Sequence, residues 1–136
     1  NYEKLKKNLK DFDGRFLAFK KAVSSKNFSS YLNLEKSGVY NSISNLNKKL
    51  NYYKKEKCEV VSINSCIDRA VKQYGKIDLI KIDNEGEELK TVASIDRKFW
   101  QYIKCLNVDG ESVREYVPRN FSLTKLGSAQ RYFKNE

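Results

Sequence analysis

Three side chains that could take part in chemistry stand close together in the middle of the chain. Lys81, Asp83 and Glu85 occupy every second position at the end of a short apolar run. A carboxylate can act as a general base, and it also stabilises a cation that lies near it. Because the sequence contains no His, these three residues are the candidate bases here, and Lys81 could also pair with one of the carboxylates.

The residues around this group predict a strand, a tight turn and a helix. Residues 77–82 form a mostly β-branched, apolar run, which is typical of a buried strand. The run stops at Asp83, a turn follows at Gly86, and helical spacing then relates Leu89, Val92 and Ile95. In open α/β sheets, ligands bind beyond the carboxyl ends of the strands, where Asp83 and Glu85 stand. The alternative is that these two carboxylates only cap the following helix.

The rest of the chain predicts strands that alternate with helices. Apolar runs and alternation predict further strands over residues 15–23, 28–34, 59–63 and 102–108. Helical spacing predicts helices over residues 2–9 and 65–74, the second of them capped by Ser65 and Gly75. Residues 45–57 are rich in Lys and Asn and indicate either a solvated helix or a disordered loop. We therefore expect an α/β fold with a mostly parallel sheet and an antiparallel C-terminal hairpin at its edge, turning at Gly127.

Length and charge limit the possible functions. A chain of 136 residues is one domain at most. The net charge of +10 would favour acidic partners such as nucleic acid or anionic lipid. However, much of this charge comes from Lys residues spread among many Asn residues, and such a composition often reflects a bias of the genome. Nucleic-acid binding has only the charge in its favour, so we do not expect nucleic acid as a partner.

The cysteines do not form a recognisable metal or redox motif. Cys58, Cys66 and Cys105 are odd in number and lack CxxC spacing, and the chain has no His. Zinc sites and Cys–His catalysis therefore have no support, and we expect no metal. We expect three reduced thiols in a cytoplasmic protein, because no stretch resembles a signal peptide or a membrane span.

The central block resembles the most recognisable motif of the FkbM-type S-adenosylmethionine-dependent methyltransferases. That family carries the pattern Ile-Asp-hydrophobic-Ile-Lys-Ile-Asp-x-Glu-Gly-x-Glu-hydrophobic, and here it stands at residues 77–89. The flanks are similar too. Ala22-Val23-Ser24 resembles the segment after the family's third strand, residues 37–42 its Gly/Ser loop, and Cys66-Ile67-Asp68 its Thr-Leu-Asp helix start. The resemblance covers most of the chain, strongly over residues 76–92 and weakly after residue 110.

The resemblance implies a partial Rossmann-like methyltransferase sheet, S-adenosylmethionine as cofactor, and O-methyl transfer to a small molecule or a saccharide. It implies that Asp83 faces the methyl group or the acceptor. The catalytic residues would be Asp83, Glu85 and Lys81. The cofactor would be held by Ala22, Val23, Ser24 and Asp83. The acceptor would be bound by Glu85, Gly86, Glu88 and Ser42.

Two of the family's cofactor-binding elements have no counterpart in the sequence. Members hold the cofactor with a Gly-rich loop after their first strand and an acidic residue at the end of their second, but no Asp-x-Gly-x-x-x-Gly pattern occurs. Residue 1 is Asn rather than Met. We therefore expect residues 1–136 to be the C-terminal part of one methyltransferase-like domain, lacking the first and second strands. If the chain were complete, cofactor affinity would be weak or absent. The alternative is a degenerate, non-catalytic binding module.

Overall fold

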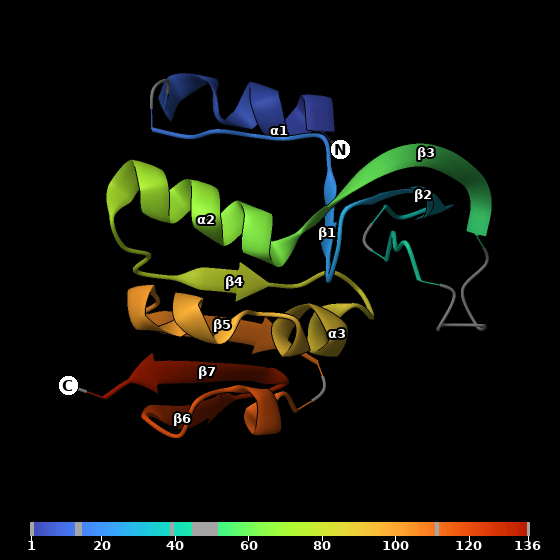
Figure 1. Cartoon of the computed structure of the whole chain (residues 1–136). Helices are drawn as coiled ribbons and strands as arrows, with labels where there is room; N and C mark the ends of the chain where they lie inside the picture. The colour runs from blue at the N-terminus through green and yellow to red at the C-terminus, as the bar shows by residue number, and fades with distance from the viewer. Residues whose placement is uncertain (1, 13–14, 39, 45–51, 111, 136) are drawn as a thin grey trace.

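The chain forms two small sheets with helices beside them in a computed structural model (Figure 1). The structure describes residues 2–12, 15–38, 40–44, 52–110 and 112–135. The first sheet has the order β1-β3-β2 and the second the order β4-β5-β7-β6. The strands of the first sheet are β1 (Ala22–Ser24), β2 (Phe28–Glu35) and β3 (Tyr52–Ser62). Those of the second are β4 (Ile80–Ile82), β5 (Cys105–Asp109), β6 (Phe121–Leu126) and β7 (Ala129–Lys134).

Helices flank these sheets. The longest is α2 (Ile63–Tyr74), and the α-helices α1 (Tyr2–Asn8) and α3 (Glu88–Ala93) are shorter. The described residues also form the 3₁₀ helices η1 (Lys10–Phe12), η2 (Arg97–Tyr102) and η3 (Arg114–Tyr116). None of the helices in the described part of the chain is long and apolar enough to cross a membrane.

The caps of α2 confirm one sequence prediction and correct another. Gly75 adopts the left-handed conformation (φ 77°) and its N–H bonds to the carbonyl of Val71, as expected of a C-cap. The N-cap is Ser62 and not Ser65, because the Ser62 side chain accepts a hydrogen bond from the Ser65 N–H at 3.0 Å. The helix therefore begins directly after β3.

The prediction of an α/β fold is confirmed, but that of a mostly parallel sheet is wrong. Among the described strands, β1–β3 and β4–β5 are parallel, whereas β2–β3, β5–β7 and β6–β7 are antiparallel. Strands joined by a tight turn pair antiparallel, and β6 with β7 is such a pair. The C-terminal hairpin is confirmed, since β6 and β7 pair next to the turn at Gly127.

Two predicted segments also differ from the structure. Tyr52–Lys57 belongs to β3 and is neither helix nor disordered loop, while residues 45–51 lie outside the described residues. The charges of this half of β3 concealed the strand, because its side chains are mostly solvated. Of residues 15–23, predicted as a strand, only Ala22 and Val23 lie in β1. The apolar residues before them alternate but gain no ladder partner among the described residues.

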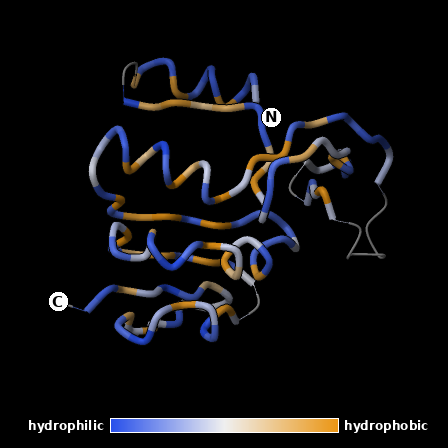
Figure 2. Tube along the Cα trace, in the orientation of Figure 1, coloured by the Kyte–Doolittle hydropathy of each residue, from blue (hydrophilic) through white to orange (hydrophobic). Residues whose placement is uncertain are grey.

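The core lies around the second sheet. Leu106, Val108 and Tyr132 have no exposed surface, and α2 and η2 contribute further apolar side chains. Phe99 and Trp100, predicted as core residues, are each 6% exposed, and the Trp100 ring meets the Phe121 ring edge-on at 5.5 Å. Figure 2 shows apolar residues along β4 and hydrophilic ones along much of α1 and the outer half of β3. β4, the strand that leads to Asp83, is therefore held in place by the other strands of the second sheet and the core around them.

Candidate functional site

The carboxyl ends of β1 and β4, which belong to different sheets, meet at the segment after β4. β4 is held in the core by pairing with β5, with Ile80 opposite Leu106 and Ile82 opposite Val108. The Asn84 side-chain amide then donates to the carbonyl of Val23 at 3.1 Å and to the Thr91 hydroxyl at 3.2 Å. The two strand ends that the sequence predicted to face one ligand are thus in direct contact.

Two further hydrogen bonds fasten residues 83–88 to the first sheet and its loop. The Ser24 hydroxyl donates to the Glu87 carboxylate at 2.6 Å, and both residues are buried. The hydroxyl of Ser42 donates to the backbone carbonyl of Glu85 at 2.6 Å. Sequence reasoning missed Asn84 and Glu87, which occupy the two variable positions of the motif. The available signal was that Asn84 is a polar residue just after a buried strand and that Glu87 directly precedes a helix.

The turn itself has an unusual backbone that Glu88 stabilises. Glu85 has a φ of 50° and Gly86 a φ of 101°, so both are in the left-handed region, which costs a non-glycine residue about 1 kcal/mol. The Glu88 carboxylate accepts the N–H groups of Asn84 and Gly86, each at 2.8 Å. Glu88, predicted to bind the acceptor, therefore has both carboxylate oxygens bonded within the turn.

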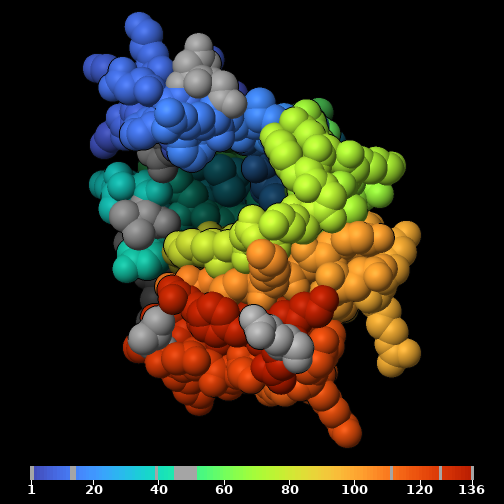
Figure 3. Space-filling model, turned by 90° about the vertical axis from the view of Figure 1, so that its left-hand side faces the viewer, coloured from blue at the N-terminus to red at the C-terminus, as the bar shows by residue number. Residues whose placement is uncertain are grey.

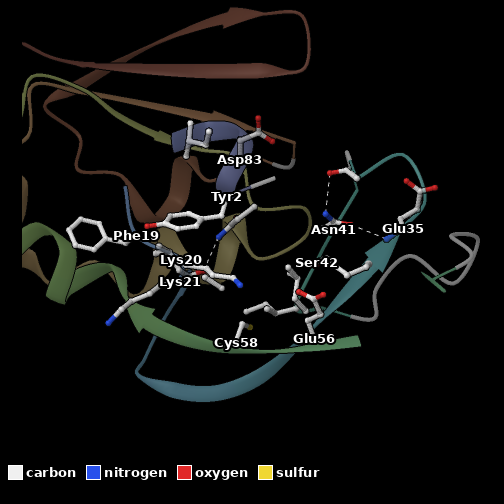
Figure 4. Close-up of a pocket in the computed structure, with 18 of the residues that line it drawn as sticks. Tyr2, Phe19, Lys20, Lys21, Glu35, Asn41, Ser42, Glu56, Cys58 and Asp83 are labelled. Atoms are coloured by element: carbon white, nitrogen blue, oxygen red, sulfur yellow. Dashed lines mark hydrogen bonds between the residues drawn. The ribbon is translucent and has the colours of Figure 1, made fainter. Parts of the chain in front are cut away.

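A pocket of about 910 Å³ opens between the two sheets and the N-terminal segment (Figure 4). Five predicted site residues line it, namely Ala22, Val23, Ser42, Lys81 and Asp83. The other four, Ser24, Glu85, Gly86 and Glu88, lie outside its lining. Figure 3 shows the surface hollowed between the N-terminal segment in blue, the β2–β3 region in teal and α2 and β4 in yellow-green.

The wall of this pocket combines apolar, aromatic and charged side chains. Tyr2, Leu5 and Phe19 come from the N-terminal segment, and Ile80 and Ile82 from β4. The first sheet and the loop after β2 contribute a further group, which includes Leu32, Leu34, Asn41, Glu56 and Cys58. Figure 4 shows Asp83 on the side of β4 and Glu56 and Cys58 on β3. The pocket can therefore accept a ligand with a flat apolar part and a charged or polar end.

Asp83 forms an ion pair with Lys81 at 2.5 Å, which confirms that Lys81 pairs with a carboxylate. The hydrogen bond and charge of Asp83 raise the pKa of Lys81 above its ordinary value. Lys81 therefore stays protonated near neutral pH and pairs with Asp83 as a cation. Neither Asp83 nor Glu85 occupies the N-cap of α3, because that residue is Glu87, which makes no side-chain capping bond.

Glu85 lies in the most acidic part of the site. Burial raises the pKa of Glu85 first, and the negative charges of Asp83, Glu88 and Asp109 raise it further. A carboxylate with a raised pKa is a stronger base, so Glu85 is tuned in the direction that general-base catalysis favours. It also means that the ionised form of Glu85 destabilises the fold.

Glu85→Gln is expected to stabilise the protein at neutral pH by up to about 1 kcal/mol. The folded-state pKa of Glu85 exceeds its unfolded value, so protonated Glu85 stabilises the folded state. This contribution to the free energy of unfolding is complete below the unfolded pKa and is lost as pH rises through the folded pKa. Urea denaturation at about pH 7 and about pH 3.5 measures this, and the gain should disappear at the lower pH. Glu3→Gln, at an exposed residue, should give no such gain. Equal gains at both pH values would contradict the assignment.

Other groups of the site give little chemical reactivity. Cys58 and Cys66 line the pocket, but burial raises the pKa of each thiol, which keeps it protonated and weakly nucleophilic. The three cysteines are free thiols. Within the described residues, no group of three or more Asp, Glu or Cys side chains is placed to hold a metal ion.

Ser24→Ala is expected to lower the free energy of unfolding by about 1–3 kcal/mol. It leaves the buried Glu87 carboxylate with Lys90, at 3.2 Å, as its remaining described partner. Urea denaturation of Ser24→Ala, Glu87→Gln and the double variant would form a double-mutant cycle, in which we expect non-additive losses. Ser29→Ala, at an exposed position of β2, should cost less than about 0.5 kcal/mol. Additive losses in the cycle would show that the Ser24–Glu87 bond contributes nothing.

Comparison with known proteins gives one match. A family model described as a Methyltransferase FkbM domain matches residues 1–115. The match includes β1 to β5, α2, α3 and the whole segment from Asp83 to Glu88, and it ends before β6. Searches of curated proteins and of solved structures found no match.

Proposed function

The chain belongs to the FkbM methyltransferase family, and we propose that it acts in S-adenosylmethionine-dependent methyl transfer to a hydroxyl group of a small molecule or a saccharide. One observation carries the proposal. Asp83, at the end of β4, lines the same pocket as Ala22 and Val23, at the end of β1. Ligand sites in α/β proteins lie at the carboxyl ends of strands, and here two such ends share one cavity.

The residues present fit the cofactor that FkbM methyltransferases generally use. S-adenosylmethionine has a cationic sulfonium and a flat adenine ring, so it suits a pocket with both a carboxylate and apolar or aromatic walls. Asp83 offers the carboxylate, Val23 and Ile82 the apolar surface, and Tyr2 and Phe19 the aromatic rings. We propose that Ala22 and Val23 lie beside the adenine. We also propose that Asp83 lies near the sulfonium, and that Ser24 keeps the end of β1 in place through Glu87.

The bound cofactor supplies an activated methyl group, and the protein mainly contributes binding, orientation and a base. In this proposal the Asp83 carboxylate accepts the proton of the acceptor hydroxyl. Lys81 orients that carboxylate through their ion pair at 2.5 Å. Glu85 adds negative charge on the same side and is the second candidate base.

The acceptor side of the pocket would be shaped by the turn after β4 and the loop after β2. We propose that Ser42 acts by holding the carbonyl of Glu85, and that Glu88 acts by holding the N–H groups of Asn84 and Gly86. Both would then fix the turn beside the acceptor without having to contact the acceptor themselves. The partly polar wall near Ser42 suits an alcohol or a saccharide better than a wholly apolar acceptor.

Isothermal titration calorimetry with S-adenosylmethionine and S-adenosylhomocysteine tests the proposal. The protein should bind both, Val23→Lys should remove binding, and Leu123→Lys on the distant strand β6 should leave it unchanged. The added Lys lies in the pocket in the first variant and would repel the sulfonium cation. A protein that binds neither compound would contradict the proposal and favour the alternative, a non-catalytic methyltransferase-like binding module.

A further inference from the structure

The N-terminal arm, defined as α1, η1 and residues 15–20, exposes large apolar side chains away from the pocket. Phe12, Phe16 and Leu17 are 48%, 53% and 62% exposed, and they are absent from the pocket lining. The rings of Phe12 and Phe16 meet edge-on at 5.6 Å. Large apolar groups that adjoin one another at a surface mark an interaction site more often than scattered ones do.

The same arm is strongly basic. Six exposed cations lie in its described residues, against the carboxylates of Glu3 and Asp11, and they are Lys4, Lys6, Lys7, Lys10, Arg15 and Lys20. None of these six forms an ion pair within the described part of the chain, whereas Lys21, next in sequence, pairs with Glu59 at 2.7 Å. Lys20 lines the pocket, and the pKa of Glu56 is lowered by its hydrogen bond to Lys54 and further by the charge of Lys20. The other five present positive charge that no carboxylate of the described residues pairs with.

The described residues of the arm lie along one edge of the molecule. The Tyr2 hydroxyl donates to the carbonyl of Ala18 at 3.3 Å, which ties α1 to the extended residues 15–20. Figure 1 shows the arm along the edge beyond α2, at the opposite end of the molecule from β6 and β7. Figure 3 shows the same segment, in blue, as the outermost layer of that end. The exposed cations and the exposed phenylalanines therefore share one edge.

We infer that the N-terminal arm docks on an anionic lipid bilayer. Lysines on a surface segment are attracted to anionic headgroups, while exposed Phe and Leu side chains enter the boundary between headgroups and acyl chains. The five cations outside the pocket suit the headgroup layer, and Phe12, Phe16 and Leu17 suit the boundary below it. A nucleic acid would also use the cations, but the aliphatic Leu17 offers no ring on which a base could stack, so this apolar group suits acyl chains better. This inference does not depend on the proposed methyl transfer.

Flotation of the protein with phospholipid vesicles tests the inference. We expect binding to vesicles of phosphatidylcholine with about 30% phosphatidylserine at about 0.1 M salt, little binding to phosphatidylcholine alone, and a steep loss as salt rises. The double variant Lys4→Glu/Lys7→Glu should bind at least about tenfold more weakly. The matched double variant Arg119→Glu/Lys125→Glu lowers the net charge equally at the far end of the molecule, and it should bind as the unaltered protein does.

A second pair of variants tests the apolar part of the contact. Phe16→Ser should bind the anionic vesicles about tenfold more weakly, because the favourable free energy of burying the Phe16 ring in the membrane interface is lost. Phe133→Ser, at an exposed position of β7, should bind normally. Equal losses in the two charge variants, or no vesicle binding together with binding to a single-stranded oligonucleotide, would overturn the inference.

Discussion

Replacing Asp83 by Ala is expected to lower methyl transfer about 10²–10⁴-fold and to leave the fold intact. The Asp83 side chain is 37% exposed and lines the pocket, so its loss opens no hole in the core. The variant removes the proposed base and leaves Lys81 as an unpaired cation in a pocket that should hold a sulfonium. Transfer of a labelled methyl group from S-adenosylmethionine to a panel of alcohols and saccharides measures the effect, and circular dichroism checks the fold.

The matched control for Asp83 is Asp78→Ala on the same segment. Asp78 also pairs with a lysine, Lys104 at 2.9 Å, but its side chain is 70% exposed and it does not line the pocket. This variant should keep methyl transfer within about twofold of the original rate and leave the urea midpoint nearly unchanged, because water and salt screen an exposed ion pair. Normal transfer by Asp83→Ala, or equal losses in the two variants, would contradict the role assigned to Asp83.

The largest expected effect on stability belongs to Leu106→Ala, which should lower the free energy of unfolding by about 2–5 kcal/mol. Leu106 is fully buried at the centre of the second sheet, opposite Ile80 on β4 and Tyr132 on β7. Its loss leaves a cavity directly beside the strand that leads to Asp83. We therefore expect weaker ligand binding as well as a lower urea midpoint, since β4 loses much of its support.

Leu123→Ala is the control for this cavity. Leu123 lies on β6, also opposite Tyr132, but it is 37% exposed. Water can fill the space that the side chain leaves, so the loss should stay near 1 kcal/mol or below. Urea denaturation measures both variants. Equal losses of unfolding free energy in the two variants would show that the core is centred on the hairpin and not on the β4–β5 pair.

Local patterns predicted the parts of the fold that local physics controls. The strand that ends at Asp83, the left-handed cap at Gly75 and the C-terminal hairpin follow from apolar runs and turn residues within a few positions. Burial of Trp100 followed from its size. The family match over residues 1–115 agrees with a resemblance strongest over residues 76–92 and weak after residue 110.

The remaining features depend on contacts between distant residues. The charged half of β3 is a strand because β2 lies beside it, with Tyr31 opposite Lys57, and no periodicity in Tyr52–Lys57 indicates this. The bonds from Ser24 to Glu87 and from Ser42 to Glu85 join residues 63 and 43 positions apart. Single polar residues carry no periodic signal. The sequence therefore predicted the turn after β4 but not the hydrogen bonds from Ser24 and Ser42 that hold it in place.

The most direct test of the account is an NMR titration of the isotope-labelled protein with S-adenosylmethionine. Backbone amide signals of residues 22–24 and 81–86 should shift together and saturate, because the ends of β1 and β4 share one pocket. Signals of β6 and β7 should stay unchanged. Saturating shifts confined to β6 and β7, or no shifts at any concentration, would contradict a cofactor site at Asp83.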